Sequence, residues 1–372
     1  MRLLMDARYT RLGRHDGISR YGAGLIGAMA GLAAADPGLD LAMLVSDPRQ
    51  LAMLPDVPHV TGPSPVSAAE AATALVVNRY RPDVVFSPMQ TMGSAGRRHG
   101  LVLTLHDLIY YDHPRPPSDL PAPVRGGWRL YHRAWWPQRV LLDRADAVVT
   151  VSDTTRELIA AHRLTRRPVH VVPNAPQPGS VLEPAAALAR LPGREKLLLY
   201  MGAFLPYKNV ETLLRAAARL PDHELHLLSG ISEARRAELE ALVPAGARVV
   251  FHGGVSEAEY ARLLGRAAAL LTASRAEGYG LPVVEALAAG TPVVCSDLPI
   301  FREVAGDAAA YAPADDDAAF AAAVRALEDP RRRRARVLAG LERARAYSWE
   351  DSARALLGVA RGVHERRLTA GR

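Results

Sequence analysis

The stretch 274–290, S-R-A-E-G-Y-G-L-P-V-V-E-A-L-A-A-G, carries the residues of this chain whose types and spacing best suit chemistry. Its glycines let the backbone turn tightly after an apolar strand pattern at 268–272, and Pro282 suits the first turn of a helix. A strand, a glycine loop and a helix N-terminus together favour an anion such as phosphate. Glu277 and Glu285 would then hold hydroxyl groups of the same ligand, although loop and helix glutamates are usually solvated.

Lys208 is the next candidate, because lysine is almost absent from this chain. Of the 46 basic residues only Lys196 and Lys208 are lysine. Codon bias explains the excess of arginine, so a retained lysine indicates a place that suits a compact ammonium on a flexible stem. Lys196 reads as ordinary surface. Lys208 lies in the loop 202–209, before a helix that Asn209 would cap, and we expect it to contact phosphate rather than only solvent.

His106 and Asp107 follow the apolar strand pattern at 101–105. A lone histidine at the end of a strand is more often structural, but the neighbouring Asp107 and the L-I-Y-Y that follows make a site role about equally favoured here, so residue chemistry alone leaves both interpretations open. His252 stands isolated at another strand end, so no cluster of metal ligands is predicted beside the two glutamates.

The segment 124–144 combines tryptophans with arginines at a spacing of four, Arg125, Arg129 and Arg133. A basic aromatic helix could dock on anionic lipid headgroups. The alternative, which we favour, is a domain helix with Trp128, Trp135 and Trp136 turned inward and its arginines in water.

These candidates need a scaffold, and strand patterns alternate with helical patterns along the chain. The alternation is typical of doubly wound parallel sheets, which bind ligands at the carboxyl ends of their strands. We predict an α/β protein with two Rossmann-like domains, at 1–175 and 194–347. A linker would occupy 176–193, and a C-terminal helix would follow at 348–372.

The net charge of +7 favours anionic partners such as nucleotides, acidic glycans or membrane surfaces. The arginine run 331–334 reads as a solvated helix face, and no nucleic-acid-binding motif accompanies it. The sequence has no run of 18 apolar residues, so no membrane span is predicted. Asp6 comes too early for a signal peptide. Cys295, the only cysteine, lies in an apolar strand pattern typical of a structural thiol. We therefore expect a cytoplasmic protein, with peripheral contact at the inner face of the membrane through 124–144 as an open alternative.

Several motifs in order resemble those of retaining glycosyltransferase family 4, over nearly the whole chain. E-G-Y-G-L-P-V-V-E resembles the family's E-x7-E signature, and P-Y-K-N resembles its P-R-K-N loop. M-D-A-R with G-I-S-R-Y, L-H-D-L-I-Y-Y and V-V-P-N resemble its opening strand and loop, its His-Asp stretch and its domain junction. The chain looks most like the mannosyltransferase B-like branch, which acts on surface polysaccharides. The resemblance implies a GT-B fold: an acceptor domain, then a nucleotide-sugar domain across a deep cleft, then a helix that crosses back.

By position, the resemblance assigns Glu277 to the donor hexose, Glu285 to the ribose and Lys208 to the diphosphate. His106 would lie near the transferred sugar, and Gly17 would let the chain close over the diphosphate. Further donor contacts would come from Gly202, Ser229, Gly230, Val255, Gly278, Tyr279, Gly280 and Leu281.

The chain departs from the family pattern at two positions of the diphosphate site. Ala203 stands where many members have an arginine, and Tyr207 replaces the arginine of P-R-K-N. Lys208 would then carry the charge of the leaving group with fewer helpers, or Arg275 or Arg20 would substitute.

The resemblance implies transfer of a hexose with retention of configuration, from a nucleotide diphosphate sugar to a glycan or lipid-linked acceptor. The resemblance implies neither a metal nor another cofactor. The nucleotide sugar itself counts as a co-substrate. We expect GDP-mannose as the donor, from the branch resemblance alone. A nucleotide-sugar-binding protein without transfer activity and a GT-B epimerase or phosphorylase remain the alternatives.

Overall fold

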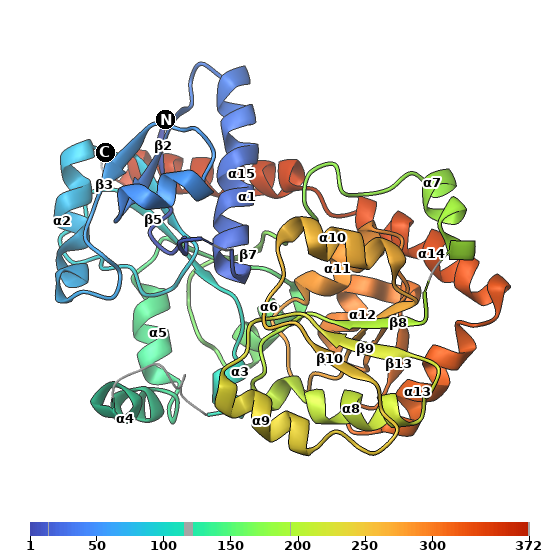
Figure 1. Ribbon diagram of the computed structural model, residues 1–372. Coiled ribbons are helices and arrows are strands. Elements are labelled where there is room, and N and C mark those ends of the chain that lie inside the picture. The colour runs from blue at the N-terminus through green and yellow to red at the C-terminus, as the bar shows by residue number, and fades with distance from the viewer. Residues whose placement is uncertain (14, 115–121, 194, 371–372) are drawn as a thin grey trace. The chain divides into compact units, whose positions relative to one another are not determined.

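The computed structural model describes residues 1–370 except residue 14, residues 115–121 and residue 194. The chain divides into two compact units. Figure 1 labels their helices and strands on a chain coloured from blue at the N-terminus to red at the C-terminus. The first unit comprises residues 1–174 with 348–372, and the second comprises residues 175–347. Both are layered α/β structures, as the alternation of patterns predicts.

The described residues of the first unit contain a seven-stranded sheet in the order β3-β2-β1-β4-β5-β6-β7. All of its strand pairs are parallel. The strands are β1 (Arg2–Asp6), β2 (Asp40–Val45), β3 (His59–Thr61), β4 (Val84–Ser87), β5 (Gly100–Leu105), β6 (Ala147–Thr150) and β7 (Val169–Val171). β4, β5 and β6 are buried along their whole length, which is why they read as near-continuous apolar runs.

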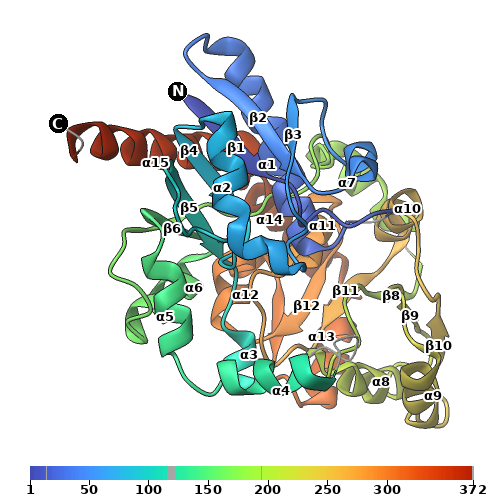
Figure 2. The ribbon, with the colours of Figure 1, turned by 90° about the vertical axis from the view of Figure 1, so that its left-hand side faces the viewer.

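The helices of the first unit are α1 (Gly17–Ala35), α2 (Thr73–Val77), α3 (Ile109–Asp112), α4 (Ala122–Tyr131), α5 (Trp136–Asp143), α6 (Asp153–Ala161) and α15 (Trp349–Ala370), with short 3₁₀ turns at Pro48–Met53, Ala68–Ala72 and Asn78–Tyr80. The C-terminal α15 packs along α1 and onto β4 and β5, as the red helix beside the blue strands in Figure 2 shows. Gly24 permits this approach, because a Cβ there would lie 2.5 Å from Cε2 of Trp349. The last helix thus completes the first unit.

In the part of the second unit that the structure describes, a six-stranded sheet has the order β10-β9-β8-β11-β12-β13, again with parallel pairs. Its strands are β8 (Leu197–Tyr200), β9 (Glu224–Leu227), β10 (Val249–Phe251), β11 (Ala269–Thr272), β12 (Val293–Ser296) and β13 (Ala310–Ala312). Its helices are α7 (Pro184–Ala189), α8 (Val210–Ala218), α9 (Glu233–Ala241), α10 (Glu257–Arg266), α11 (Leu281–Ala288), α12 (Pro299–Ala305), α13 (Asp317–Ala326) and α14 (Pro330–Arg345), with 3₁₀ turns at Leu191–Gly193, Pro206–Lys208 and Gly306–Ala308.

The segment predicted as a linker, 176–193, is part of the second unit. It contains α7, and Ala187 is completely buried against Val337 and Leu341 of α14. Gly290 leaves room for this contact, since a Cβ there would lie 2.8 Å from Cβ of Ala187. The sequence hides the helix because proline, glycine and alanine dominate the segment without a helical apolar period.

Each sheet reverses its strand order at one point, between β1 and β4 in the first unit and between β8 and β11 in the second. In open parallel sheets the connections leave such a point in opposite directions, so the loops at the carboxyl ends diverge and leave room for a ligand. The two reversals therefore predict the edge at which each unit binds a ligand. Among the described residues, no helix is both long and apolar enough to cross a membrane.

Candidate active site

Lys208 and Glu277 meet at the reversal of the second sheet. Lys208 ends the turn that follows β8, and Glu277 lies in the loop that follows β11. Because β8 and β11 are neighbouring parallel strands, their loops leave the same edge side by side. Nζ of Lys208 lies 2.6 Å from Oε1 of Glu277, and the two side chains are only 15% and 13% exposed. The hydroxyl of Ser274 donates to the same carboxylate oxygen at 3.0 Å.

The glycine loop before α11 has the local structure that the sequence predicts. Gly280 precedes the helix with φ at +93°, and Pro282 lies in the first turn. A Cβ on Gly280 would come within 2.7 Å of the Phe301 ring, so packing as well as backbone conformation requires glycine there. Tyr279 is buried with its ring edge-on to Tyr347. Glu285 lies one turn into α11 and is partly buried.

Other predicted donor residues gather at the same edge of this sheet. The hydroxyl of Ser229, after β9, accepts a hydrogen bond from the Gly202 amide, after β8, at 3.0 Å. A Cβ on Gly254 would lie 3.9 Å from Cα of Gly230, so the loops after β9 and β10 are neighbours, and Val255 follows directly. The arrangement follows from the parallel order β10-β9-β8-β11.

Asn209 occupies the N-cap position of α8, but its side chain does not cap the helix as predicted. Its backbone is left-handed, with φ at +52°. Its amide instead donates to the Ala314 carbonyl at 2.7 Å and to Asp315 at 3.2 Å. The residue that follows Lys208 is therefore held by the loop after β13 as well as by Thr212 of α8, whose hydroxyl donates to the Asn209 side-chain oxygen at 3.1 Å.

His252 is not isolated as the sequence suggests. Its Nε2 lies 2.9 Å from Nδ1 of His226, and Nε2 of His226 lies 2.9 Å from Glu224. The contact between His252 and His226 joins the end of β10 to β9, and the contact between His226 and Glu224 lies within β9. Among the described residues, no group of three or more histidine, cysteine or acidic side chains is arranged to hold a metal ion.

His106, directly after β5 in the first unit, is partly buried, with its ring edge-on to Tyr21 at 5.1 Å. Its Nε2 lies 2.7 Å from the Pro88 carbonyl oxygen and must donate, because a carbonyl only accepts. Burial lowers the pKa of His106, and the contact with Pro88 and the charge of Asp16 only partly oppose this. The His106 ring is therefore neutral, with its proton on Nε2. Gly17, the first residue of α1, lies exposed in the same unit.

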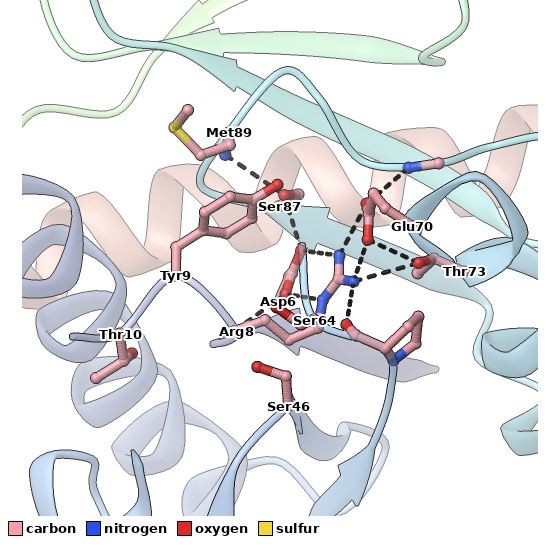
Figure 3. Close-up of polar contacts among 12 residues, drawn as sticks. Asp6, Arg8, Tyr9, Thr10, Ser46, Ser64, Glu70, Thr73, Ser87 and Met89 are labelled. Atoms are coloured by element: carbon pink, nitrogen blue, oxygen red, sulfur yellow. Dashed lines mark hydrogen bonds and ion pairs between the residues drawn. The ribbon is translucent and has the colours of Figure 1, made fainter. Parts of the chain in front are cut away.

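The reversal of the first sheet holds a buried charge network that sequence reasoning missed (Figure 3). The guanidinium of Arg8 contacts both oxygens of Asp6, at 2.8 and 2.9 Å, and Oε2 of Glu70 at 2.5 Å. The side chains of Arg8 and Asp6 have no exposed surface. Burial alone would lower the pKa of Arg8, but the two carboxylates outweigh it and raise that pKa, so the guanidinium stays charged.

This network joins the loops that follow β1, β3 and β4. Ser87, at the end of β4, donates to Asp6 at 3.0 Å, and the Gly93 amide donates to Glu70 at 2.9 Å. Tyr9 lies beside the network with its hydroxyl 3.0 Å from Oγ1 of Thr91. The D-A-R triplet at the end of a strand was the only sequence signal, and nothing in the sequence links it to Glu70.

The segment 124–144 forms two helices, α4 and α5, rather than one continuous stripe. Trp128 packs on His132 and Tyr110, and Trp135 stacks between Tyr111 and His162. These aromatics are packed as the favoured interpretation predicts. Trp136 is the exception, since 65% of it is exposed.

Two family models match the chain in succession. "Glycosyltransferase Family 4" matches residues 34–176, and "Glycosyl transferases group 1" matches residues 187–339. The O-antigen chain mannosyltransferase B of Escherichia coli is 33% identical over 267 residues, which is 67% of each chain. The MMP alpha-(1->4)-mannosyltransferase of Mycolicibacterium hassiacum is 28% identical over 70% of this chain and 64% of its own.

Solved structures show the same fold. Sucrose-phosphate synthase from Thermosynechococcus elongatus superposes with a TM-score of 0.73 over all of both chains, at 22% identity. Anabaena HepE, solved in complex with UDP and glucose, gives a TM-score of 0.68 over 96% of this chain and 98% of its own, at 15% identity. The two doubly wound sheets, the consecutive family models and the mannosyltransferase relatives lead to one conclusion: this chain is a GT-B glycosyltransferase that belongs to glycosyltransferase family 4.

Proposed function

We propose that the enzyme transfers a hexose, with mannose favoured, from a nucleotide diphosphate sugar to a hydroxyl of a glycan or lipid-linked acceptor, with retention of configuration. The Lys208–Glu277 pair carries the proposal. An ammonium and a carboxylate at the carboxyl edge of a parallel sheet match the two parts of such a donor, a diphosphate and a ring of hydroxyls. The mannosyltransferase relatives support mannose and a surface-polysaccharide role, with GDP-mannose as the expected donor.

The barrier to transfer arises as the bond from C1 to the phosphate oxygen stretches and negative charge builds on the diphosphate. Lys208 and the N-terminal ends of α8 and α11 would stabilise that charge, because fixed donors and dipoles require no reorganisation at the moment of reaction. In this role they would take the place of a metal ion. Glu277 would hold the hexose hydroxyls, and Glu285 would hold the ribose.

The acceptor would bind to the first unit at its own reversal, where Tyr9 and Thr91 present a hydroxyl pair. His106, neutral with its proton on Nε2, would offer Nδ1 as an acceptor for a sugar hydroxyl. Retention would follow from front-face displacement, in which the departing phosphate oxygen takes the proton of the attacking hydroxyl.

The experiment is to incubate the protein with GDP-mannose, UDP-glucose and other activated hexoses and to measure thermal shift and release of nucleoside diphosphate. A competent transferase leaks sugar to water, so slow release from one donor is expected. Binding without release would favour a nucleotide-sugar-binding protein. A changed sugar on intact nucleotide would favour an epimerase, and strict dependence on added phosphate a phosphorylase.

Contact with an anionic membrane remains part of the proposal, on a smaller surface than 124–144. Trp136 and Val140 lie one turn apart on α5 and are 65% and 45% exposed. Beside them, a pocket of about 750 Å³ is lined by Arg139, Val140, Asp143, Arg144, Arg163, Thr165 and Arg166. Apolar side chains next to guanidinium groups suit the interface of a bilayer with anionic headgroups.

A further inference from the structure

Arg275 joins the two loops that carry Lys208 and Glu277. It lies two residues before Glu277, and its backbone N–H donates to the Tyr207 carbonyl at 2.7 Å. Its side chain donates to the Pro206 carbonyl at 3.2 Å through Nη1 and to Oδ1 of Asp315 at 2.5 Å through Nη2. One residue thus ties the loop after β11 to the loop after β8 and to the loop after β13.

Asp315 extends the connection to the residue beside Lys208. Its Oδ1 accepts hydrogen bonds from both Arg275 and the amide of Asn209. Asn209 is 1% exposed, and its left-handed backbone sets the direction in which the chain leaves Lys208. Arg275 and Asn209 therefore share one carboxylate oxygen, and Lys208 lies between residues held by that oxygen and by Arg275.

We propose that Arg275 is a positioning residue, which holds Lys208 and Glu277 in register through Asp315 instead of binding the donor diphosphate itself. The inference rests on the proposed function, because it concerns the geometry of the same donor site. It also accounts for Ala203 and Tyr207: this chain lacks two arginines common at the site and stiffens the loop that carries Lys208.

Stability does not explain the arrangement. The side chains of Arg275 and Asp315 are 42% and 66% exposed, and ion pairs this exposed contribute little to the free energy of unfolding. The reaction rate is more sensitive than the free energy of unfolding to the positions of Lys208 and Glu277, because a misplacement of about 1 Å in an active site can cost on the order of 10²-fold in rate. Loss of the pair should therefore be visible in turnover and not in the melting temperature.

The competing assignment is direct binding of phosphate by Arg275. The two assignments predict opposite effects of Asp315→Asn on nucleotide affinity. If Arg275 binds phosphate, Asp315→Asn releases the guanidinium and leaves nucleotide affinity unchanged or higher. If Arg275 positions Lys208, Asp315→Asn weakens the site in the same direction as Arg275→Met. The double variant should then be no worse than Arg275→Met alone, because both single changes break one connection.

The experiment compares wild type, Arg275→Met, Asp315→Asn and the double variant by calorimetry with GDP and by kcat and KM for GDP-mannose hydrolysis. We expect kcat to fall roughly 10- to 100-fold in all three variants, with a smaller loss of GDP affinity and unchanged melting temperatures. Arg275→Lys, which keeps one donor, should recover part of the loss. Arg262→Met is the matched control, since Arg262 forms an exposed 2.6 Å pair with Glu259 within α10 of the same unit, outside the loops after β8, β11 and β13.

Two outcomes overturn different claims. Unimpaired hydrolysis by Arg275→Met, or GDP affinity that rises in Asp315→Asn, contradicts the positioning role while the donor assignment stands. Absence of both GDP binding and GDP-mannose hydrolysis in wild type overturns the proposed donor and this inference with it.

Discussion

The ammonium of Lys208 lies 2.6 Å from the carboxylate of Glu277, although 69 residues separate them in sequence. In the protein without ligand, each charge is the other's partner. A nucleotide diphosphate sugar would offer both a replacement, phosphate oxygens for Lys208 and hydroxyl groups for Glu277. The pair would thus keep two mostly buried charges neutralised before a donor binds in the proposed site, since an unpaired buried charge is costly.

Lys208→Ala should lower kcat for donor hydrolysis or transfer by roughly 10² to 10³, the usual cost of one donor that stabilises transition-state charge. Lys196→Ala is the control, because the other lysine forms only an exposed pair with Asp222. Steady-state kinetics with GDP-mannose would measure both. Turnover near that of wild type in Lys208→Ala would remove Lys208 from the mechanism.

Glu277→Gln and Glu285→Gln should separate transfer from nucleotide binding. We expect Glu277→Gln to abolish transfer while GDP still binds, because GDP lacks the hexose that Glu277 would hold. Glu285→Gln should weaken GDP binding by roughly 10- to 100-fold, the value of one hydrogen bond to a charged group. Calorimetry with GDP would measure the difference, and equal losses in both variants would contradict the division of roles.

Arg8→Met should destabilise the first unit by about 3–5 kcal/mol, because it leaves two carboxylates, Asp6 and Glu70, buried without their cation. Urea unfolding would measure the change. Arg49→Met removes the partner of Asp47 in a pair where the arginine side chain is 76% exposed, and it should have no measurable effect. Equal stability of the two variants would show that the network at the reversal of the first sheet is not structural.

Folding stability should fall as the pH is lowered from about 7 to 4, in part because of His99. Burial, with help from Arg97 and Arg367, lowers the pKa of His99 from 6.5 to about 4. Between these values the unfolded chain binds a proton that the folded chain does not, so stability is lost as the pH falls, by up to about 3 kcal/mol. His99→Asn keeps a donor for Asn78, with which Nδ1 now pairs, and cannot titrate. The melting temperature of this variant should depend less on pH than that of wild type. An identical pH dependence in the two proteins would exclude His99 as a source of the stability loss.

Liposomes containing anionic lipid should retain the protein at low salt, and Trp136→Ser with Val140→Ser should reduce retention. The matched control is Leu242→Ser in the second unit, where an apolar side chain is 53% exposed without the arginine pocket. Retention that is independent of both salt and lipid charge would argue against this surface, because guanidinium contacts to headgroups are screened by salt.

The sequence predicted local structure well where the signal lies within one element. The strand patterns at 101–105 and 268–272 match β5 and β11 to within one residue, and α11 begins after Gly280 with Pro282 in its first turn. The prediction missed β3, because H-V-T is too short to show a period. It placed Asn209 correctly at the start of α8 but gave its side chain the wrong partner, since the Ala314 carbonyl that it contacts lies 105 residues away.

The sequence by itself determined the chemistry that is available: two glutamates around a glycine loop, only two lysines in an arginine-rich chain, and two series of alternating strands and helices. Only the tertiary structure decided which of these residues meet. Lys208 and Glu277 pair because β8 lies beside β11, and Arg8 reaches Glu70 because the loops after β1 and β3 leave the same edge of one sheet. The physical reason is that residue types and periodicity act over a few residues, whereas strand order is set by burying the whole apolar surface of each unit at once.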